Sequence, residues 1–420
     1  MIYIFLISLF FITSCAKKTE EREIVIWHWM TDREDAFSRL AQEFMVERGI
    51  KVKFELYAPS EVYSQKVRAA AQTNTLPDIF GILGSPRDFA SFIKAGFVED
   101  LTMYMEENNG KWKNSFYPQA IETVSFKDGN MYGVKPGIYG IPIDMMNIQM
   151  ICNTEILKKA GIEKIPETWE EYVDAGRKLK KKGINVFVSG WGEVWLLEAM
   201  ATSFAFNIMG PEKVFNTFKG EVPYTDPDWI KVFSLFDTMR KEGLFIKDSI
   251  TMVNKTAEQM FANGRSAFTF NGSWCINVYK GMNPNLKYSP CLLPKVNRGN
   301  PVYIWGGSGS WFVVNSKSKY KKEAIEFLKW LTSSQQQKFL TEETMNLPSN
   351  KDAAEKLKGL LKEFALGMKY VTHPNFWPVH ETPEVIEKFD KGIQLILIGK
   401  KTPFQVAKEL DKYKKEQLKE

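Results

Sequence analysis

Strand-like and helix-like segments alternate over the first hundred residues, and this order constrains the fold more than any other feature of the sequence. The predicted elements are a strand over 23–29, a helix that ends before Gly49, a strand over 52–57, a helix over about 60–73 and a short strand over 77–80. β-Branched and aromatic residues mark the strands, and apolar residues at helical spacing mark the helices. Because crossovers between parallel strands are right-handed, this β-α-β-α-β order predicts parallel neighbours in one sheet covered by helices.

Residues that follow these strands are the first candidates for a binding site. In open sheets of this kind, ligands bind in the crevice beyond the carboxyl ends of the strands. The residues predicted to reach that crevice are His28, Trp29, Thr31, Asp32, Ser60, Glu61, Gly84 and Ser85. Asp32 and Glu61 stand where helices begin, so each is either a ligand-facing carboxylate or a helix cap that the helix dipole favours. We expect His28 and Asp78 to be structural.

A second alternation begins beyond residue 145. Predicted strands lie at 147–152, 184–189 and 267–271, and one of the helices between them opens with the capping box Thr168-Trp169-Glu170-Glu171. A strand over 310–314 with an amphipathic helix after it forms a third mixed region. The chain therefore supports two α/β lobes, and the lack of a short fixed repeat argues against solenoids and propellers.

Length and composition agree with a globular protein of two or three domains. The chain has 420 residues, of which 44% are hydrophobic and 25% are charged. The formal charge of +6 is spread along the sequence, which argues against nucleic acid as a partner.

The N-terminus has the pattern of an export signal. Residues 2–12 are almost wholly apolar, but this run is far shorter than the roughly 20 residues of a membrane-spanning helix. Ile12-Thr13-Ser14-Cys15 resembles the lipobox of bacterial lipoproteins, in which the signal is cut before the cysteine and lipid is attached to it. We expect residues 1–14 to be the signal peptide, Cys15 the lipidated residue and 15–22 a polar tether. No Lys or Arg precedes the apolar run, and the alternative is a plain cysteine in a signal that is cut elsewhere.

Three further cysteines, Cys152, Cys275 and Cys291, are an odd number without close spacing. This pattern argues against a disulfide framework or a zinc site, although one bridge is compatible with an oxidising compartment. We expect each of the three to be a plain buried residue. The sequence leaves open whether Cys275 and Cys291 pair.

Catalytic signatures are largely missing from the chain. It contains no P-loop, no dinucleotide-binding glycine motif, no H-E-x-x-H and no complete G-x-S-x-G. The chain has only three histidines, which makes a histidine-based catalytic triad or a multi-histidine metal site unfavourable. They are His28, His373 and His380. We therefore expect no catalysis, no cofactor and no metal. A secreted carbohydrate-active enzyme is the less favoured alternative, because a glycosidase needs only two suitably spaced carboxylates.

A set of short motifs follows one order along the chain. In sequence they are Leu76-Pro77-Asp78-Ile79, Tyr139-Gly140-Ile141-Pro142, Asn153-Thr154-Glu155-Ile156-Leu157, Pro166-Glu167-Thr168-Trp169-Glu170-Glu171, Phe261-Ala262-Asn263-Gly264-Arg265-Ser266-Ala267-Phe268, Asn271-Gly272-Ser273-Trp274 and Gly306-Gly307. Each string is weak alone, but their order and spacing cover about residues 24–350. By these motifs the chain resembles the extracellular solute-binding proteins, family 1, of sugar-type bacterial ABC importers, in their lipoprotein form.

The resemblance implies a type II periplasmic-binding-protein-like α/β fold, in which hinge strands join two lobes around a ligand cleft. The implied segments are 23–140 plus 292–345 for lobe 1, 141–291 plus 346–420 for lobe 2, and hinge crossings near 139–144, 288–294 and 345–349.

A sugar-binding site needs flat rings for the C–H face of the sugar and charged or amide groups for its hydroxyls. The candidate rings lie in loops or at strand ends, and they are Trp29, Trp191, Trp274, Trp305 and Trp377. Trp274 matches the stacking position of the family in N-G-x-W, and core or hinge packing is the alternative for every ring. The candidate polar residues are Asp144, Asp32, Glu61, Glu193 and Asn271. Asp144 follows the G-I-P crossing, where the family often places a ligand-facing polar group.

The resemblance implies a receptor that captures a sugar or oligosaccharide outside the cytoplasmic membrane and delivers it, unaltered, to a permease with ATPase subunits. We expect an exported monomer, anchored through its N-terminal lipid at the outer face of the cytoplasmic membrane or in the periplasm. The alternative is a receptor of the same fold for a non-sugar solute such as a polyamine or a glycerophosphodiester. An anionic ligand would require cations in the cleft, and the nearest candidates, Arg33, Arg87 and Arg265, form no cluster. A cationic ligand would require carboxylates around stacked rings.

Overall fold

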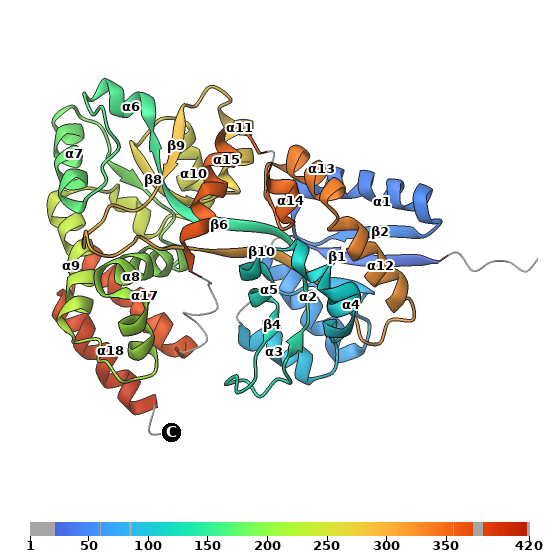
Figure 1. The fold of residues 1–420 in the computed structure, drawn as a ribbon. Helices are drawn as coiled ribbons and strands as arrows, with labels where there is room; N and C mark the ends of the chain where they lie inside the picture. The colour runs from blue at the N-terminus through green and yellow to red at the C-terminus, as the bar shows by residue number, and fades with distance from the viewer. Residues whose placement is uncertain (1–21, 59, 84–85, 356, 373–380, 418–420) are drawn as a thin grey trace, which may run out of the picture.

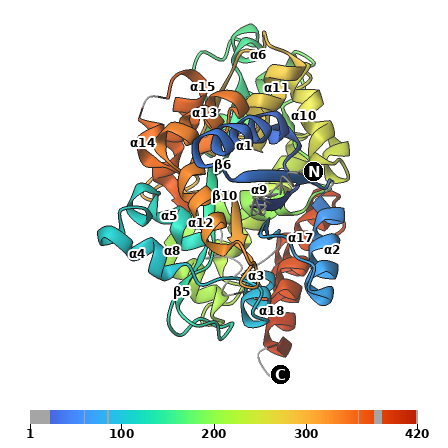
Figure 2. The same cartoon turned by 90° about the vertical axis from the view of Figure 1, so that its right-hand side faces the viewer.

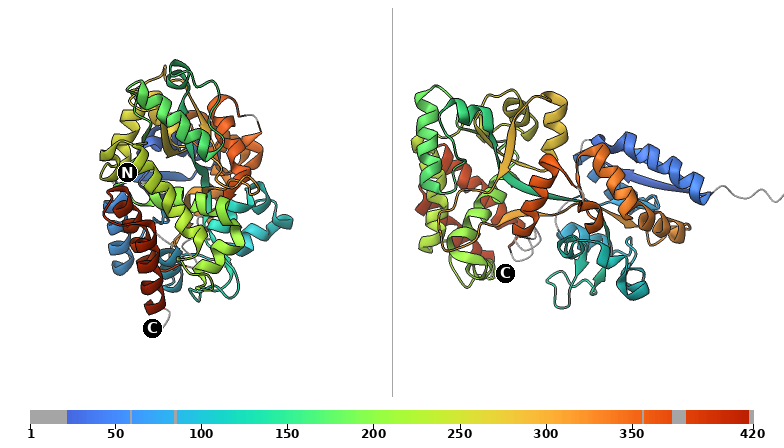
Figure 3. Two further views of the ribbon diagram at one scale, coloured as in Figure 1. Left: turned by 90° about the vertical axis from the view of Figure 1, so that its left-hand side faces the viewer. Right: turned by 45° about the horizontal axis from the view of Figure 1, so that its top comes forward.

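Two α/β lobes, joined by a narrow waist, make up the molecule (Figures 1 and 3). The structure is a computed structural model, and it describes residues 22–417 except 59, 84–85, 356 and 373–380. One sheet runs through both lobes in the order β2-β1-β3-β10-β6-β8-β7. Its central strands, β6 (Ile141–Asn153) and β10 (Ile304–Val314), cross the waist side by side. We call the β2 side lobe 1 and the β7 side lobe 2.

Lobe 1 confirms the predicted β-α-β-α-β order. Strand β1 (Glu23–His28) pairs in parallel with β2 (Lys51–Leu56) and with β3 (Ile79–Gly81). Helices α1 (Glu34–Arg48) and α2 (Ser60–Thr73) connect these strands, and Figure 2 shows them on opposite sides of the sheet.

Side-chain alternation along β1 explains the two helix layers. Ile24 and Ile26 pack in one buried cluster with the apolar face of α1, whereas Val25 and Trp27 pack in another cluster with α2. The other elements of lobe 1 are α3 (Pro86–Lys94), α4 (Thr102–Gly110), α5 (Pro118–Thr123), β4 (Ser125–Phe126), β5 (Gly137–Ile138), α12 (Lys321–Leu331), α13 (Ser334–Thr344) and α14 (Lys351–Ala354).

The two crossing strands are longer than the sequence predicted. In their antiparallel register, Gly306 lies opposite Asn147 and Phe312 lies opposite Ile141, and the short strand β11 (Leu347–Pro348) pairs with β6 beside them. The predicted strands at 147–152 and 310–314 are therefore only the outer halves of β6 and β10. The register shifts near Gly309, where a Cβ would lie 2.5 Å from Asp144 Oδ1, so the close approach of the strands requires a glycine there.

Lobe 2 holds the larger core. Its strands are the end of β6, β7 (Phe187–Val188), β8 (Phe268–Gly272), β9 (Tyr288–Cys291) and β12 (Val371–Thr372). Its helices are α6 (Thr154–Lys159), α7 (Trp169–Lys181), α8 (Trp195–Phe218), α9 (Pro227–Glu242), α10 (Asn254–Ala262), α11 (Cys275–Met282), α15 (Gly359–Gly367), α17 (Pro383–Leu397) and α18 (Pro403–Gln417). The predicted capping box at the start of α7 is confirmed, because Thr168 and Glu171 bond each other's backbone N–H groups. Across the described ranges, no helix has the length and apolar content that a bilayer crossing needs.

The chain changes lobes later than the resemblance implied. Leu293 and Val302 lie in the core of lobe 2, and β9 pairs with the lobe 2 half of β6, so the second crossing runs along β10 instead of near 288–294. Helix α14 packs on α13 in lobe 1, whereas Leu361 of α15 packs beside α10 and α11 in lobe 2. The third crossing therefore lies between α14 and α15, beyond 345–349. The second crossing comes late because β10 spans both lobes.

Candidate functional site

The strands of the two lobes end facing each other at the waist. Strands β3 and β6 are both antiparallel to β10, so β1, β3 and β6 all run from lobe 1 toward lobe 2. Strand β8 is antiparallel to β6 and parallel to β7, so β7 and β8 run from lobe 2 toward lobe 1. Open α/β sheets bind ligands at the carboxyl ends of their strands, and two sets of such ends converge here.

Three half-buried indole rings gather at the lobe 2 strand ends, and we call them the indole cluster. Trp274 follows β8, Trp195 begins α8, and Trp305 is the second residue of β10. The ring centroid of Trp195 lies 6.0 Å from that of Trp274 and 6.3 Å from that of Trp305. Gly272 makes room for this arrangement, because a Cβ at that position would lie 1.9 Å from an atom of the Trp274 ring.

A buried carboxylate holds the N–H edge of Trp274. Trp274 Nε1 donates to Glu258 Oε1 at 3.3 Å, and Asn271 Nδ2 donates to the same oxygen at 3.0 Å. Glu258 is 5% exposed, and this burial raises the pKa of its carboxyl, although the hydrogen bonds from Asn271 and Trp274 oppose the shift. Asn271 is itself buried, so its amide positions Glu258 and does not face a ligand, contrary to our prediction.

A second carboxylate holds Trp195. Trp195 Nε1 donates to Glu193 Oε2 at 3.3 Å, and Glu193 Oε1 accepts from the backbone N–H of Asn254 at 2.7 Å. Nε1 of Trp305 is buried and has no hydrogen-bond partner among the described residues. The cluster therefore has two rings whose orientations are fixed by carboxylates.

The lobe 1 side presents another half-buried indole. The Trp29 ring lies against Gly81, where a Cβ would be 2.2 Å from a ring atom, and its centroid is 5.2 Å from that of Tyr63. The Tyr63 hydroxyl is buried and hydrogen-bonds the backbone of Gly81 at 2.8 Å, which fixes the ring beneath Trp29. Asp32 lies three residues after Trp29 and is exposed. Its carboxylate accepts a hydrogen bond from Asn346 Nδ2 at 3.0 Å. No side-chain hydrogen bond caps the start of α1, so Asp32 does not have its alternative role as a cap.

Asp144 is a hinge residue, which corrects the prediction that it faces the ligand. It is the fourth residue of β6 and is 3% exposed, and its carboxylate forms an ion pair with Arg33. Ser310 of β10 donates its backbone N–H to Asp144 Oδ1 at 2.7 Å, and Arg33 Nη1 donates to Ser310 Oγ at 3.1 Å. Burial raises the pKa of the Asp144 carboxyl, while Arg33 and Ser310 oppose that shift. These contacts leave the carboxylate no group free for a ligand, and they tie the residue just before α1 to both crossing strands.

Trp191 is a core residue, contrary to its predicted place among the ligand-facing rings. Its side chain is fully buried, with ring centroids 5.4 Å from Phe187 and 5.3 Å from Phe245. The adjacent Gly192 packs directly on the backbone of Thr251, where a Cβ would lie 2.6 Å from the carbonyl oxygen. The glycine thus serves close packing instead of ligand access.

Several predicted residues have other outcomes. His28 is structural as expected, because it is buried edge-on between Phe37 and Phe54. Asp78 is also structural: it accepts from the backbone N–H of Val25 at 2.9 Å. Cys15, Trp377, Gly84 and Ser85 lie outside the described residues, as do the side chains of Ser60 and Glu61.

Sequence reasoning missed Trp195 and Glu258. Trp195 lies four residues after Trp191 in the string WGEVW, and we chose the indole next to glycine instead of the one that begins a helix. Glu258 carries no local signal, because its role depends on contacts between α10 and the end of β8.

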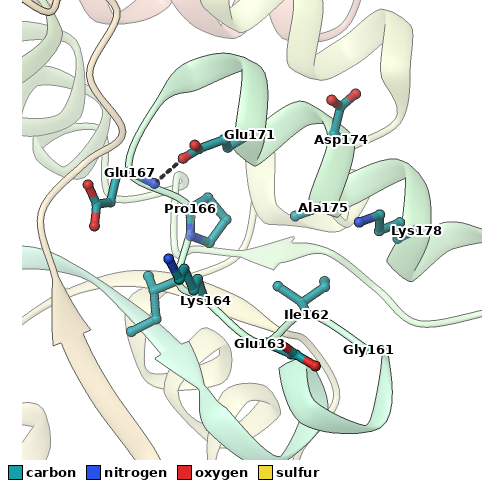
Figure 4. Close-up of a pocket in the computed structure, with 11 residues that line it drawn as sticks. Gly161, Ile162, Glu163, Lys164, Pro166, Glu167, Glu171, Asp174, Ala175 and Lys178 are labelled. Atoms are coloured by element: carbon teal, nitrogen blue, oxygen red, sulfur yellow. Dashed lines mark hydrogen bonds between the residues drawn. The ribbon is translucent and has the colours of Figure 1, made fainter.

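A separate hollow of about 490 Å³ lies on the outer side of lobe 2, between α7 and the loop that precedes it (Figure 4). Glu163, Glu167 and Lys178 are among the charged residues that line it. Glu171 is occupied there, since it accepts the backbone N–H of Glu167 at 2.8 Å. This hollow lies away from the converging strand ends. Within the described part of the chain, no three His, Cys, Asp or Glu side chains gather to hold a metal ion.

Known proteins are similar in sequence to most of this chain. A sequence model of the family described as bacterial extracellular solute-binding protein matches residues 29–338. The multiple sugar-binding protein of Streptococcus mutans is 25% identical over 267 residues, which cover 62% of this chain and 59% of that protein. The melibiose/raffinose/stachyose-binding protein MelE of Bacillus subtilis is 26% identical over 341 residues, which cover 79% of this chain and 75% of that protein.

A solved structure shares the fold. A chitin oligosaccharide binding protein matches with a TM-score of 0.76 at 21% identity, over 94% of this chain and 98% of that chain. The periplasmic-binding-protein-like fold of two α/β lobes is thereby confirmed.

Proposed function

Because the chain belongs to the bacterial extracellular solute-binding protein family, we propose that it is the receptor of an ABC importer for a sugar or oligosaccharide. The family is extracellular, so the chain is an exported protein. Its relatives from Streptococcus mutans and Bacillus subtilis are named for the sugars they bind, which supports a carbohydrate ligand here.

The observation that carries the proposal is the indole cluster with its two carboxylates. A sugar has an apolar C–H face that packs on flat rings and a rim of hydroxyls that bonds to charged or amide groups. Trp195 and Trp274 supply rings whose N–H edges are held by Glu193 and Glu258, so their positions are set before a ligand arrives. The ring of Trp305 adds a third aromatic surface beside that of Trp195.

Capture and release follow from the two-lobe architecture. A ligand that touches Trp29 from lobe 1 and the indole cluster from lobe 2 gains both sets of contacts only when the lobes are closed, so it shifts the population toward closure. The crossing strands β6 and β10 are the elements about which such a hinge motion turns. A permease with ATPase subunits then recognises the closed form and takes the sugar unaltered. The chain itself performs no catalysis in this scheme.

The N-terminal sequence agrees with a receptor that delivers its sugar to a permease in the membrane. Lipid on Cys15 would hold a monomeric receptor at the outer face of the cytoplasmic membrane, and the tether over 15–22 would let the lobes reach the permease. High local concentration then replaces high affinity between receptor and permease.

A cationic solute such as a polyamine is the second candidate, and one specific observation favours it. Glu193 and Glu258 place two carboxylates around three indoles, an arrangement that also suits a cation over an aromatic face. An anionic glycerophosphodiester fits poorly, because Arg33 is buried in its ion pair with Asp144.

A thermal-shift screen distinguishes these ligands. The chain without its signal would be melted with melibiose, raffinose, stachyose and chitin oligosaccharides, with spermidine, and with glycerophosphocholine. A ligand at 100 times its dissociation constant stabilises the folded state by about 2.7 kcal/mol. We expect a shift from at least one sugar. A shift from spermidine or glycerophosphocholine alone would refute the sugar assignment, and no shift from any of these compounds would count against the receptor.

A further inference from the structure

Cys152 and Cys291 are neighbours across one strand pair. In the antiparallel register of β6 and β9, Cys291 lies opposite Met150, and Cys152 lies opposite Ser289. Residues two apart on a strand share a face, so Cys152 and Cys291 are diagonal neighbours on the same face of this pair. The Cys152 thiol donates to the carbonyl oxygen of Ser289, which lies two residues before Cys291 on β9, at 3.5 Å. The two cysteines are far apart along the chain, so the fold alone brings them together.

The two sulfurs differ in accessibility and in acidity. Cys291 is half-buried at the strand edge, whereas Cys152 is fully buried behind it. The neighbouring Cys291 thiol lowers the pKa of the Cys152 thiol, whereas Cys152 together with burial raises the pKa of the Cys291 thiol. Reagents thus reach Cys291 first, and Cys152 is the sulfur that ionises more readily.

Cys275 offers an internal comparison. It begins α11 and is buried in a different cluster, among side chains of α10 and α15. Burial raises the pKa of its thiol, so it is both shielded and weakly nucleophilic. This geometry places Cys152, and not Cys275, next to Cys291.

We propose that Cys152 and Cys291 are joined by a disulfide bond in the exported protein, which links the crossing strand β6 to β9. Exported proteins meet oxidising conditions, where neighbouring thiols are converted to disulfides. Of the proposed function, this inference requires only that the protein is exported. It does not depend on the identity of the ligand.

The oxidant is the disulfide form of a thiol–disulfide oxidoreductase. The Cys291 sulfur, on losing its proton, attacks one sulfur of that disulfide, and the second sulfur leaves and takes up a proton. The Cys152 thiolate then attacks the Cys291 sulfur in the mixed disulfide, and the oxidoreductase departs as a dithiol. Two electrons and two protons have moved from the cysteine pair to the oxidant, and one S–S bond has formed in the protein.

This bond would fasten the outer half of β6 into lobe 2. Cys152 lies near the end of β6 that is remote from the waist, so the bridge would leave the hinge and the indole cluster untouched. We therefore expect it to raise the stability of lobe 2 without changing ligand affinity.

Peptide mapping of the full chain tests the bridge. The protein would be exported, alkylated in denaturant without reductant, digested and analysed by mass spectrometry. We expect a linked pair of peptides that contain Cys152 and Cys291 and that separate on reduction, with Cys275 alkylated throughout. Full alkylation of Cys152 and Cys291 without reductant, or a bridge that includes Cys275, would overturn the proposal.

A stability measurement provides an independent readout. Reductant should lower the melting temperature of the natural chain by several degrees, and the Cys275→Ala variant should respond in the same way. The double variant Cys152→Ala, Cys291→Ala should be insensitive to reductant. An equal response of this double variant, or no response of the natural chain, would contradict the bridge.

Discussion

Trp274 Nε1 donates to Glu258 Oε1 at 3.3 Å, and this bond joins the loop after β8 to helix α10. The same carboxylate oxygen accepts from Asn254 Nδ2 at 3.2 Å and from Asn271 Nδ2 at 3.0 Å. Because Glu258 is almost wholly buried, these bonds are shielded from water and hold the ring in place without a ligand. The central ring of the proposed site is therefore supported by a buried network.

Removing the Glu258 carboxylate should loosen the indole cluster. Glu258→Ala leaves the N–H groups of Asn271 and Trp274 without their acceptor, at a cost of about 1–3 kcal/mol, and we expect sugar affinity to fall about tenfold or more. Glu258→Gln keeps an acceptor oxygen, so its sugar affinity should fall less than that of Glu258→Ala. Isothermal titration calorimetry measures both, with Lys255→Ala as an exposed control on the same helix. Unchanged affinity of Glu258→Ala would show that the network does not position the ring.

The hinge ion pair should contribute strongly to stability. Asp144→Asn leaves the buried Arg33 charge without its main partner, and we expect a loss of about 3–5 kcal/mol in the free energy of unfolding. Asp32 offers a matched control, because it pairs with the same arginine at 3.6 Å but is exposed. Asp32→Asn should cost less than about 1 kcal/mol. Chemical denaturation at neutral pH measures both variants, and equal losses would contradict the assignment of Asp144 as the buried partner.

His28 should make the protein sensitive to acid. Burial, followed by the charge of Arg33, lowers the pKa of His28 to about 4, although Asp32 opposes the shift. The unfolded chain binds a proton near pH 6.5, whereas the folded chain does not until about pH 4, so stability falls as the pH drops through this window. Between pH 7 and pH 4, the free energy of unfolding of His28→Leu should fall by about 2–3 kcal/mol less than that of the natural chain. Denaturant midpoints at the two pH values measure this, and parallel losses in both proteins would refute the role of His28.

Glu198 should have the opposite dependence on pH. Burial raises the pKa of Glu198 to about 8, and Asp390, beside it on α17, has its pKa raised by burial and by the charge of Glu198. The unfolded carboxyl ionises near pH 4.5 while the folded one keeps its proton to about pH 8, so this group lowers stability as the pH rises between these values. Glu198→Gln should raise the melting temperature at pH 8 by several degrees and leave it nearly unchanged at pH 4.5. A variant that melts lower at pH 8 would contradict this expectation.

Much of the fold could be predicted because its signals are local. Helix α2 begins and ends where the spacing of apolar residues predicted, and the Thr168 capping box begins α7. The crossing halves of β6 and β10 escaped prediction because Pro142 and the glycines at 306, 307 and 309 interrupt the pattern of a strand. Their strand conformation depends on each other, which no local pattern records.

The site was harder to predict than the fold. Trp274 could be selected from its glycine-rich loop, but the choice between Trp191 and Trp195 depends on Gly192 packing against Thr251, a contact between distant segments. Asp144 looked available to a ligand because its partner Arg33 lies on another element. Long-range pairing decides which polar residues are taken up by the protein itself.

The central claim is that a sugar is held, unaltered, against the indole cluster. Calorimetric titration of the natural chain, Trp274→Ala and Trp112→Ala with the best sugar from the screen tests it, because Trp112 bonds Thr332 in lobe 1 and has no contact with the cluster. We predict at least a tenfold loss of affinity for Trp274→Ala, natural affinity for Trp112→Ala, and recovery of the intact sugar by mass spectrometry. Equal affinities for all three proteins, or conversion of the sugar, would contradict the account.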